Sequence, residues 1–309
     1  AVSEDGEVAA FGTDTNGCTG QGENGLSKIH RLPRWMYWIS TDTTRILACA
    51  TGESHTLLLS ASWHVFTTGD GAYGKLGHGD TRSFSTPRRV EPLIGLKISS
   101  ISAGHNHSLF ITDSGLLYGC GANSHGQLGS GDCDDRMLPV RIYHPDFIGD
   151  PVHRYEEEPE LRTLELQERI LGPLPGVKGQ FLSNLEAARP FAQPTEQQLE
   201  AAVKAREAKL GIQQQQTDEE IRLKLGIAAS KPNTSRVMQA CGGRAHTVIL
   251  TQLGQVYVCG QSNRGQLGLG NRNSVWQPAL VQTMVNLSCV QIAAGDDHSV
   301  MLSSLGHAY

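Results

Sequence analysis

One short signature recurs along the chain at a fixed distance. It reads Gly-x-x-His followed by Ser or Thr, and its four copies begin at Gly52, Gly104, Gly243 and Gly295. Gly52 and Gly104 are 52 residues apart, and the same 52 residues separate Gly243 from Gly295. A fixed period of this size is typical of proteins built from stacked supersecondary units. The chain is therefore expected to be a repeat protein.

A second, glycine-rich signature alternates with the first. It occurs as "GCTGQG" from residue 17, "GKLGHG" from 74, "GQLGSG" from 126 and "GQLGLG" from 265, and a proline follows each copy. Lys75 in the second copy is followed by Leu76, whereas a phosphate-binding P-loop has Ser or Thr after its Gly-Lys pair. Four spaced copies indicate turns of the fold, in which glycine supplies positive φ angles and close backbone approach.

Each period contains short apolar runs separated by tight turns. "HSLFITDSGLLYGCG", "HTVILTQLGQVYVCG" and "HTLLLSASWHVFTTG" each read as strand, turn, strand. The strands are continuously apolar, which predicts that both faces of each sheet are covered. Several short strands in each repeat, packed on the strands of the next repeat, are typical of a β-propeller.

The two signatures together resemble the RCC1 (regulator of chromosome condensation) repeat. The pattern joins Gly-x-x-His-[Ser/Thr] and three apolar residues to the glycine-rich segment and its proline, over residues 1–149 and 237–309. The resemblance implies an all-β fold, the RCC1-like seven-bladed β-propeller. The chain holds about four to five blades' worth of it, and both ends fall inside a hairpin. We therefore expect a segment of a longer protein or a chain with parts missing.

Residues 150–236 interrupt the repeat and differ from it in composition. The segment is rich in Glu, Gln, Leu, Ala and Arg, which favour helices. "TEQQLEAAVKAREAKLG" and "TDEEIRLKLG" each begin with a capping box and end at a glycine. A long insert can also be a tolerated loop. We predict a helical arm that contacts another protein or the flank of the propeller.

No motif in the sequence indicates catalysis, a metal site or a cofactor. A histidine that recurs in every repeat, as His55, His107, His246 and His298 do, favours a structural role at the start of a strand. The seven cysteines include no Cys-x-x-Cys pair, so a zinc site and a disulfide framework are both disfavoured. We predict reduced thiols and an intracellular protein, cytoplasmic or nuclear.

The candidate binding residues are those that vary within the repeated frame. The two positions between the Gly and the His differ from copy to copy, as binding residues on a rigid scaffold do. Trp63 occupies a turn position that is glycine in the other copies. The predicted partner-binding residues are Glu53, Trp63, His105, Asn106, Arg244, Asp296 and Asp297. The alternative is that they are solvated turn residues.

These observations predict a non-catalytic protein-binding propeller that acts as a scaffold or regulatory module. The net charge of −5 disfavours direct nucleic-acid binding, and no apolar run is long enough to span a membrane. Two alternatives remain. The resemblance implies a guanine-nucleotide exchange factor for a Ran-like small GTPase, since acidic and histidine residues of this loop face contact Ran in the family. Glu53, Asp296 and Asp297 match those acidic positions. The chain could also be the partner-recruiting propeller of a large ubiquitin ligase.

Overall fold

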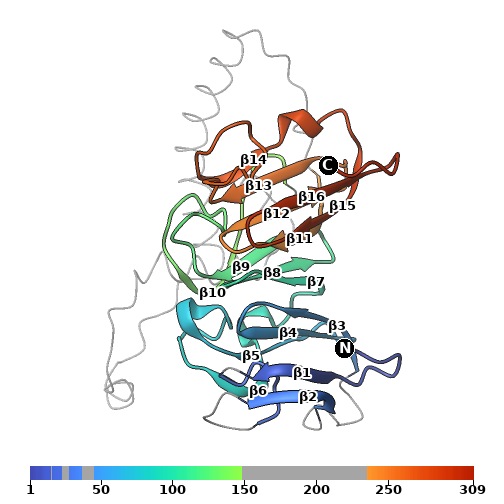
Figure 1. Cartoon of the computed structure of the whole chain (residues 1–309), viewed down its shortest axis with the longest axis vertical. Coiled ribbons are helices and arrows are strands. Elements are labelled where there is room, and N and C mark those ends of the chain that lie inside the picture. Colours follow the sequence, from blue (N-terminus) through green and yellow to red (C-terminus); the bar gives the residue numbers. More distant parts are fainter. Residues whose placement is uncertain (15, 23–27, 37–44, 148–234) are drawn as a thin grey trace, which may run out of the picture. The chain divides into compact units, whose positions relative to one another are not determined.

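The computed structural model describes residues 1–14, 16–22, 28–36, 45–147 and 235–309 (Figure 1). The chain divides into two compact units, one made of Ala1–His153 and Thr234–Tyr309 and the other of Arg154–Asn233. All described residues belong to the first, which we call the β unit. The predicted helical arm, residues 150–236, lies outside the described residues except for its last two.

Three four-stranded antiparallel sheets, with their strands in sequence order, make up most of the β unit. The first sheet is β3 (Ile46–Thr51), β4 (His55–Ser60), β5 (Val65–Gly69) and β6 (Phe84–Arg89). The second is β7 (Ile98–Ala103), β8 (His107–Thr112), β9 (Leu117–Gly121) and β10 (Arg136–Arg141). The third is β11 (Val237–Gly242), β12 (His246–Thr251), β13 (Val256–Gly260) and β14 (Val275–Leu280).

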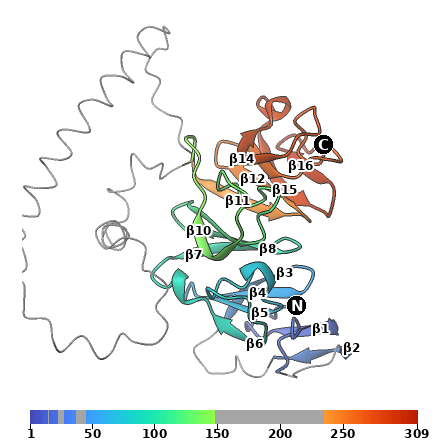
Figure 2. The same ribbon diagram turned by 90° about the vertical axis from the view of Figure 1, so that its left-hand side faces the viewer.

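Two further sheets have two strands each among the described residues. They pair β1 (Ala9–Asp14) with β2 (Lys28–Trp35), and β15 (Cys289–Ala294) with β16 (Ser299–Ser303). Short 3-10 helices occur in the loops at η2 (Ala72–Gly74), η3 (Glu91–Leu93) and η4 (Gln282–Met284). The five sheets follow one another in sequence order (Figures 1 and 2). This all-β arrangement confirms the predicted four to five blades' worth of propeller.

Neighbouring sheets pack on each other through their first two strands. β3 and β4 contact β7, β7 and β8 contact β11, and β11 and β12 contact β15. A shared core between the first and second sheets contains Leu57 and Leu59 from one and Phe110 and Tyr118 from the other. All six residues of β4 are buried because the sheet is covered on both faces. The continuously apolar strands therefore have the double coverage that the sequence predicts.

The strand order places the loops on two opposite ends of each sheet. The turn after the first strand and the loop after the third lie at one end, which we call the loop face. It carries the Gly-x-x-His turns and the glycine-rich segments. The other end, the hairpin face, carries the turn between the second and third strands and the connector to the next sheet. Residues on these two faces cannot belong to one local site.

The connector between the second and third sheets contains the two junctions with the insert. Phe147 and Ser235 form an isolated parallel β-bridge, and the amide of Ser235 donates to the carbonyl of Asp146 at 2.8 Å. Phe147 and Ser235 are each 3% exposed. The side chain of Tyr257 holds this junction, because its hydroxyl donates to Oδ2 of Asp146 at 2.7 Å. The described chain thus leaves and re-enters the β unit at one place.

Candidate functional site

The histidine of the Gly-x-x-His turn joins its sheet to the next one. His55, His107 and His246 are at most 1% exposed. The Nε2 atom of each ring lies 3.0 Å from a hydroxyl of the next sheet, in the pairs His55–Ser108, His107–Thr247 and His246–Ser299. Each hydroxyl belongs to the Ser or Thr that follows the next histidine of the repeat. The signature therefore encodes a hydrogen bond between blades.

These hydroxyls also set the protonation of the rings. Each one donates to a carbonyl of a glycine-rich segment: Ser108 to Lys75 at 2.6 Å, Thr247 to Gln127 at 2.6 Å and Ser299 to Gln266 at 2.8 Å. A hydroxyl has one proton, so the ring must donate from Nε2. Burial, the largest cause, lowers the pKa of His55 and His107 to about 3 and that of His246 to about 4. These rings remain neutral at physiological pH.

Close packing explains why the signature begins with glycine. A Cβ atom on Gly104 would lie 2.2 Å from Cε1 of His107 and 2.7 Å from the carbonyl oxygen of Gly243 in the next sheet. Gly52 and Gly243 have the same surroundings. The glycine-rich segments require glycine for another reason, because their residues have positive φ, as in Gly74 (79°) and Gly77 (77°).

The variable residues of the first two turns meet across the junction between sheets. Oε2 of Glu53 lies 2.6 Å from Nε2 of His105. The Glu53 side chain is 54% exposed and that of His105 is 23% exposed. Asn106 points its Oδ1 atom toward Lys75, which donates to it from Nζ at 2.8 Å. Three of the predicted binding residues therefore form one surface.

The last two turns form a second group on the same face. The amide of Arg244 donates to the carbonyl of Asp296 at 3.1 Å, so the backbone of one turn is fixed to the next. Oδ2 of Asp297 pairs with Nε of Arg264 at 3.3 Å. Arg244 and Asp296 are exposed. The amide of His105 donates to the carbonyl of Gly243 at 3.0 Å, which connects the two groups.

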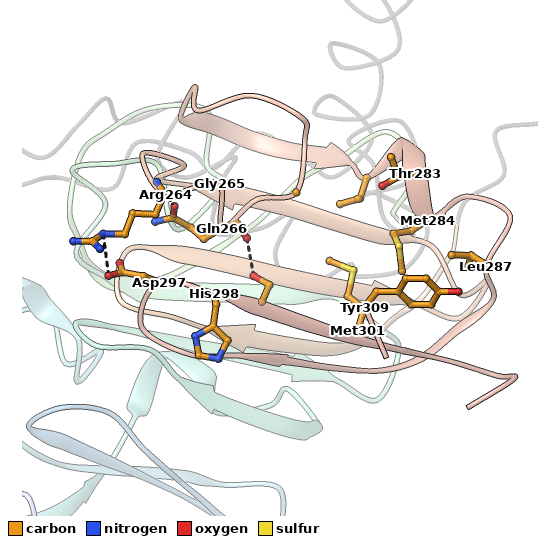
Figure 3. Close-up of a pocket in the computed structure, with 13 residues that line it drawn as sticks. Arg264, Gly265, Gln266, Thr283, Met284, Leu287, Asp297, His298, Met301 and Tyr309 are labelled. Carbon is orange, nitrogen blue, oxygen red and sulfur yellow. Dashed lines mark hydrogen bonds and ion pairs between the residues drawn. The ribbon is translucent and has the colours of Figure 1, made fainter. Parts of the chain in front are cut away.

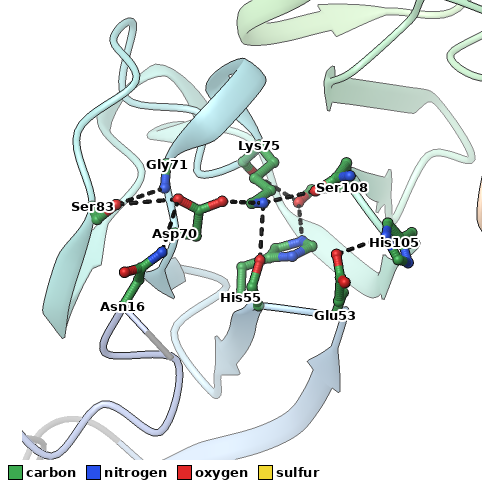
Figure 4. Close-up of polar contacts among 11 residues, drawn as sticks. Asn16, Glu53, His55, Asp70, Gly71, Lys75, Ser83, His105 and Ser108 are labelled. Atoms are coloured by element: carbon green, nitrogen blue, oxygen red, sulfur yellow. Dashed lines mark hydrogen bonds and ion pairs between the residues drawn. The ribbon is translucent and has the colours of Figure 1, made fainter. Parts of the chain in front are cut away.

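A buried lysine supports the first group (Figure 4). Lys75 is 1% exposed, and its Nζ atom donates to Oδ2 of Asp70 at 2.5 Å, Oδ1 of Asn106 at 2.8 Å and Oγ of Ser54 at 3.0 Å. Burial raises the pKa of Asp70, but the hydrogen bond and charge of Lys75 outweigh burial and hold that pKa below its usual value. An ammonium group has three N–H donors, and all three are used. Lys75 therefore has no donor left for a phosphate.

Sequence reasoning missed Lys75, Asp70 and Arg264 as parts of this face. One indication was present for Lys75, because the equivalent residues in two other copies are Gln127 and Gln266. A charged side chain at a position that is neutral in the other copies must have a polar or charged partner if it is buried. The partner could not be identified from spacing alone.

Trp63 lies apart from the other six predicted residues. It occupies the turn between β4 and β5, on the hairpin face, and is 41% exposed. Its φ angle is 67°, matching the positive φ of Gly115 and Gly254 at the same position of other copies. The predicted residues therefore divide into six on the loop face and one on the hairpin face.

Within the described ranges, no three His, Cys, Asp or Glu side chains lie together in a way that could hold a metal ion. All seven cysteines are free thiols. Burial raises the pKa of the Cys259 thiol to about 12. None of the helices in the described part of the chain has the length and apolarity needed to cross a membrane.

Comparisons with known proteins agree with the repeat pattern. The family model described as Regulator of chromosome condensation (RCC1) repeat matches residues 64–111, 114–152 and 254–302, and a second model of this description matches 98–127 and 240–266. The human E3 ubiquitin-protein ligase HERC2 is 27% identical over 303 residues, which are 97% of this chain and 5% of that protein. The Arabidopsis thaliana Ultraviolet-B receptor UVR8 is 27% identical over 303 residues, 98% of this chain and 60% of that protein.

Solved structures show the same fold at low sequence identity. Human WBSCR16 has a TM-score of 0.61 at 19% identity, over 98% of this chain and 55% of that one. Prp20p from Saccharomyces cerevisiae has a TM-score of 0.59 at 20% identity, over 100% of this chain and 54% of that one. The chain thus spans about half the length of these neighbours. Its β unit is built from repeats of the RCC1 family, folded as blades of an RCC1-like β-propeller.

Proposed function

We propose that the β unit is a non-catalytic protein-binding propeller that acts as a scaffold or regulatory module through its loop face. One observation carries the proposal. Six variable residues lie on that face, above a buried, repeated frame of hydrogen bonds between histidines and hydroxyls: Glu53, His105, Asn106, Arg244, Asp296 and Asp297. A rigid frame that presents different side chains from each repeat suits recognition of a protein surface.

The charge of the face favours a basic partner surface. Glu53, Asp296 and Asp297 contribute three carboxylates, while Arg244 and Arg264 contribute two cations. Opposite charges at the rim of an interface increase the rate of association and the specificity. We place the protein inside the cell, in the cytoplasm or nucleus, because all of its thiols are free.

Charge reversal tests this function. We expect Glu53→Lys combined with Asp296→Lys to weaken binding to a captured partner about tenfold, or about 1.4 kcal/mol. The control is Asp113→Lys, which changes an exposed aspartate on the hairpin face. Partners are captured from cell extract with the whole chain, and their affinities are then measured with purified components. Equal affinities for all three proteins would reject the loop face as the binding surface.

Nucleotide exchange on a Ran-like small GTPase is the second candidate. Asp296 is exposed and Asp297 lies beside it, where the family resemblance places acidic contacts. The solved structure of Prp20p is described with that protein's binding properties to Gsp1p and histones. The test is release of labelled GDP from a panel of small GTPases. Asp296→Asn with Asp297→Asn should abolish acceleration, and the absence of acceleration by the wild-type protein would remove this candidate.

A partner-recruiting role in a large ubiquitin ligase is a special case of the first function. HERC2 is named as such a ligase, and the chain matches 5% of its length. In this case the loop face would bind the recruited protein, and ubiquitin transfer would require a different part of the assembly. Ubiquitination of the captured partner, lost with the Glu53→Lys and Asp296→Lys changes, would support it.

A further inference from the structure

The hairpin turn that carries Trp63 has counterparts at three other junctions between sheets, with glycine in place of the tryptophan. At each of them the carbonyl of the glycine accepts a hydrogen bond from the first residue of the next sheet. The donor amides and their acceptors are Ile46 to Gly6 at 3.1 Å, Val237 to Gly115 at 3.1 Å and Cys289 to Gly254 at 3.2 Å. A Cβ atom on these glycines would lie 2.3, 2.6 and 3.1 Å, respectively, from the nearest atom of the next sheet. Glycine therefore lets the turn pack directly on that sheet.

Trp63 does not make this contact. Among the described residues, its carbonyl receives no hydrogen bond from the amide of Ile98, which begins the next sheet. Its φ angle of 67° is one that glycine adopts freely and that a bulky residue adopts at a cost in stability. The side chain is 41% exposed, so burial compensates only in part. An exposed aromatic residue held in a strained conformation points to a role in binding.

Three cations recur beside these turns. Arg45, Lys97 and Arg236 each precede the first strand of a four-stranded sheet, and all three are exposed. A Cβ atom on Gly6 would lie 2.3 Å from Cγ of Arg45, and one on Gly115 would lie 2.6 Å from Cβ of Arg236. Lys97 occupies the equivalent place in the repeat relative to Trp63. The turns and the cations therefore belong to one surface, on the hairpin face.

The charges of these cations are not compensated. Within the part of the chain that the structure describes, none of the three forms an ion pair with a carboxylate. Arg45 donates to the carbonyl of Glu4 at 2.5 Å, which is a neutral acceptor. On the loop face, by contrast, Arg264 pairs with Asp297 at 3.3 Å (Figure 3). The hairpin face therefore has positive charge available for an anionic partner.

The number and spacing of the cations favour an acidic protein segment over a nucleic acid. Neighbouring sheets pack about 10 Å apart and an extended chain rises about 3.3 Å per residue, so carboxylates about three residues apart would match successive cations. Proteins that bind duplex DNA through its phosphates commonly make about six to ten such contacts. Asp113 is exposed on the same face and would repel a continuous chain of phosphates.

We propose that the hairpin face binds an extended, acidic segment of a partner protein. Carboxylates of that segment pair with Arg45, Lys97 and Arg236, and an apolar side chain between two of them packs on the indole of Trp63. Ile94, which is 47% exposed in the connector before Lys97, adds apolar surface. Tryptophan and arginine are among the residues that contribute most to binding at interfaces. This surface is separate from the loop face that carries the proposed function, and neither depends on the other.

The first test uses a short synthetic peptide with capped ends. It has three aspartates, each three positions from the next, one leucine before the central aspartate, and serine elsewhere. We expect it to bind the whole chain with a stoichiometry of one and to shift the indole N–H resonance of Trp63. Peptides with asparagine for the aspartates, or serine for the leucine, should bind about tenfold or more weakly. Equal calorimetric affinities for these peptides, or no binding at millimolar concentration, would overturn the proposal.

Protein variants with matched controls locate the site. Lys97→Glu should weaken peptide binding about tenfold or more, whereas Arg272→Glu makes the same charge change at an exposed residue of the loop face and should bind as the wild type does. Trp63→Gly should also weaken binding about tenfold or more. Its control is Tyr73→Gly, because Tyr73 has a φ of 62° and is 48% exposed on the loop face. Equal binding by either variant and its control rejects the site.

The stability of Trp63→Gly separates binding from packing. Glycine restores the residue that the other junctions have and removes the strain at φ 67°. The urea midpoint of unfolding should therefore stay the same or rise while binding weakens, as expected of a residue kept for function at a cost in stability. A lower midpoint together with weaker binding would make Trp63 a packing residue and overturn its role as an anchor.

Three other outcomes would assign the face to a different occupant. A short DNA duplex that binds more tightly than the peptide and is weakened by Lys97→Glu would identify a nucleic acid. Oligomers in light scattering that are lost with Trp63→Gly would identify a second copy of the chain. Peptide binding that appears only when a Gly-Ser linker replaces residues 148–234 would show that the same chain covers the face. Each result overturns the acidic segment of a partner protein as the occupant.

Discussion

His55 donates a hydrogen bond from Nε2 to Oγ of Ser108, 3.0 Å away in the next sheet. Ser108 in turn donates to the carbonyl of Lys75 in the first sheet. These two hydrogen bonds run in series across the junction and back, and all three residues are buried from water. Because two more junctions repeat this geometry, the histidine signature is a structural element that holds neighbouring blades in register.

Removing one hydroxyl from this network should be costly. Thr247→Val keeps the shape of the side chain but leaves Nε2 of His107 without a partner and the carbonyl of Gln127 with only the weak thiol donor of Cys259, 3.6 Å away. Each buried unsatisfied group costs about 1–3 kcal/mol, so we expect a loss of about 2–4 kcal/mol in the free energy of unfolding. Urea denaturation measures it. The control Thr81→Val, at an exposed position, should change stability by less than about 0.5 kcal/mol. Equal midpoints for both variants would contradict the role of the network.

The same histidines should make the fold sensitive to mild acid. Burial lowers the pKa of His55 and His107 to about 3 and that of His246 to about 4, from 6.5. Below pH 6.5 the unfolded chain takes up protons that the folded chain cannot. The three neutral rings make their full contribution to the free energy of unfolding above pH 6.5, and this contribution is lost as the pH falls toward 3–4. Within that window, each histidine lowers the free energy of unfolding by about 1.4 kcal/mol per pH unit.

Denaturation curves at pH 7.5, 6 and 5 measure this loss. The carboxylate of Asp70 contributes in a different window, because its pKa lies below the usual 3.8. Its contribution to the free energy of unfolding disappears only below about pH 4, so measurements between pH 7.5 and 5 report on the histidines and not on Asp70. A free energy of unfolding that stays constant from pH 7.5 to 5 would mean that the rings are protonated in the folded state.

The sequence predicted the frame of the candidate face but not its contacts. Spacing alone identified the turns that carry Glu53 and His105, and strand alternation would have placed them at one end of the sheets. Their ion pair could not be predicted, because it depends on how closely two sheets 52 residues apart in sequence approach each other. The periodic pattern determines position within a repeat, whereas packing between repeats determines which side chains meet.

Trp63 shows a different limit of prediction from the sequence. Its spacing correctly predicts a turn, in which the structure gives Trp63 a positive φ and an exposed side chain. Grouping it with the other candidates overlooked strand parity: the Gly-x-x-His turn follows the first strand, whereas the turn of Trp63 follows the second. In an antiparallel sheet these turns lie at opposite ends. Counting the strands of one repeat along the sequence is therefore enough to separate the two faces.

Lys75 should stabilise the folded β unit as well as hold Asn106 and Asp70 in position. Lys75→Met removes three hydrogen bonds and leaves Asp70, whose side chain is 20% exposed, without its cation. Breaking a fully buried pair costs about 3–5 kcal/mol, and the partial exposure of Asp70 reduces the expected loss to about 2 kcal/mol. Thermal and urea unfolding measure it. Adding Asp70→Asn to Lys75→Met should recover part of the loss, and no recovery would show that the charge of Asp70 is not the cause.

The last prediction concerns the junction at which the insert leaves and re-enters the β unit. Phe147 and Ser235 are bridged and buried, and Ser235 also accepts a hydrogen bond from the amide of Leu253 through its Oγ atom, at 3.2 Å. Replacing residues 148–234 with a short Gly-Ser linker therefore keeps every described contact of the junction. We expect the β unit to remain folded, with a free energy of unfolding within about 1 kcal/mol of the original.

The comparison variant is Phe147→Ala in the whole chain. Phe147 packs with Tyr257 and His144 at ring-centroid distances of 5.1 Å each, so truncating it should cost about 3–5 kcal/mol. If the insert is an arm for partner binding, the linker variant should bind captured partners more weakly, while Phe147→Ala should mainly lower stability. Calorimetric unfolding and binding assays on both variants distinguish these effects. An unfolded β unit in the linker variant would contradict the prediction. So would an insert that hydrogen exchange finds unprotected both alone and in the native assembly, because an arm that binds a partner must become ordered there.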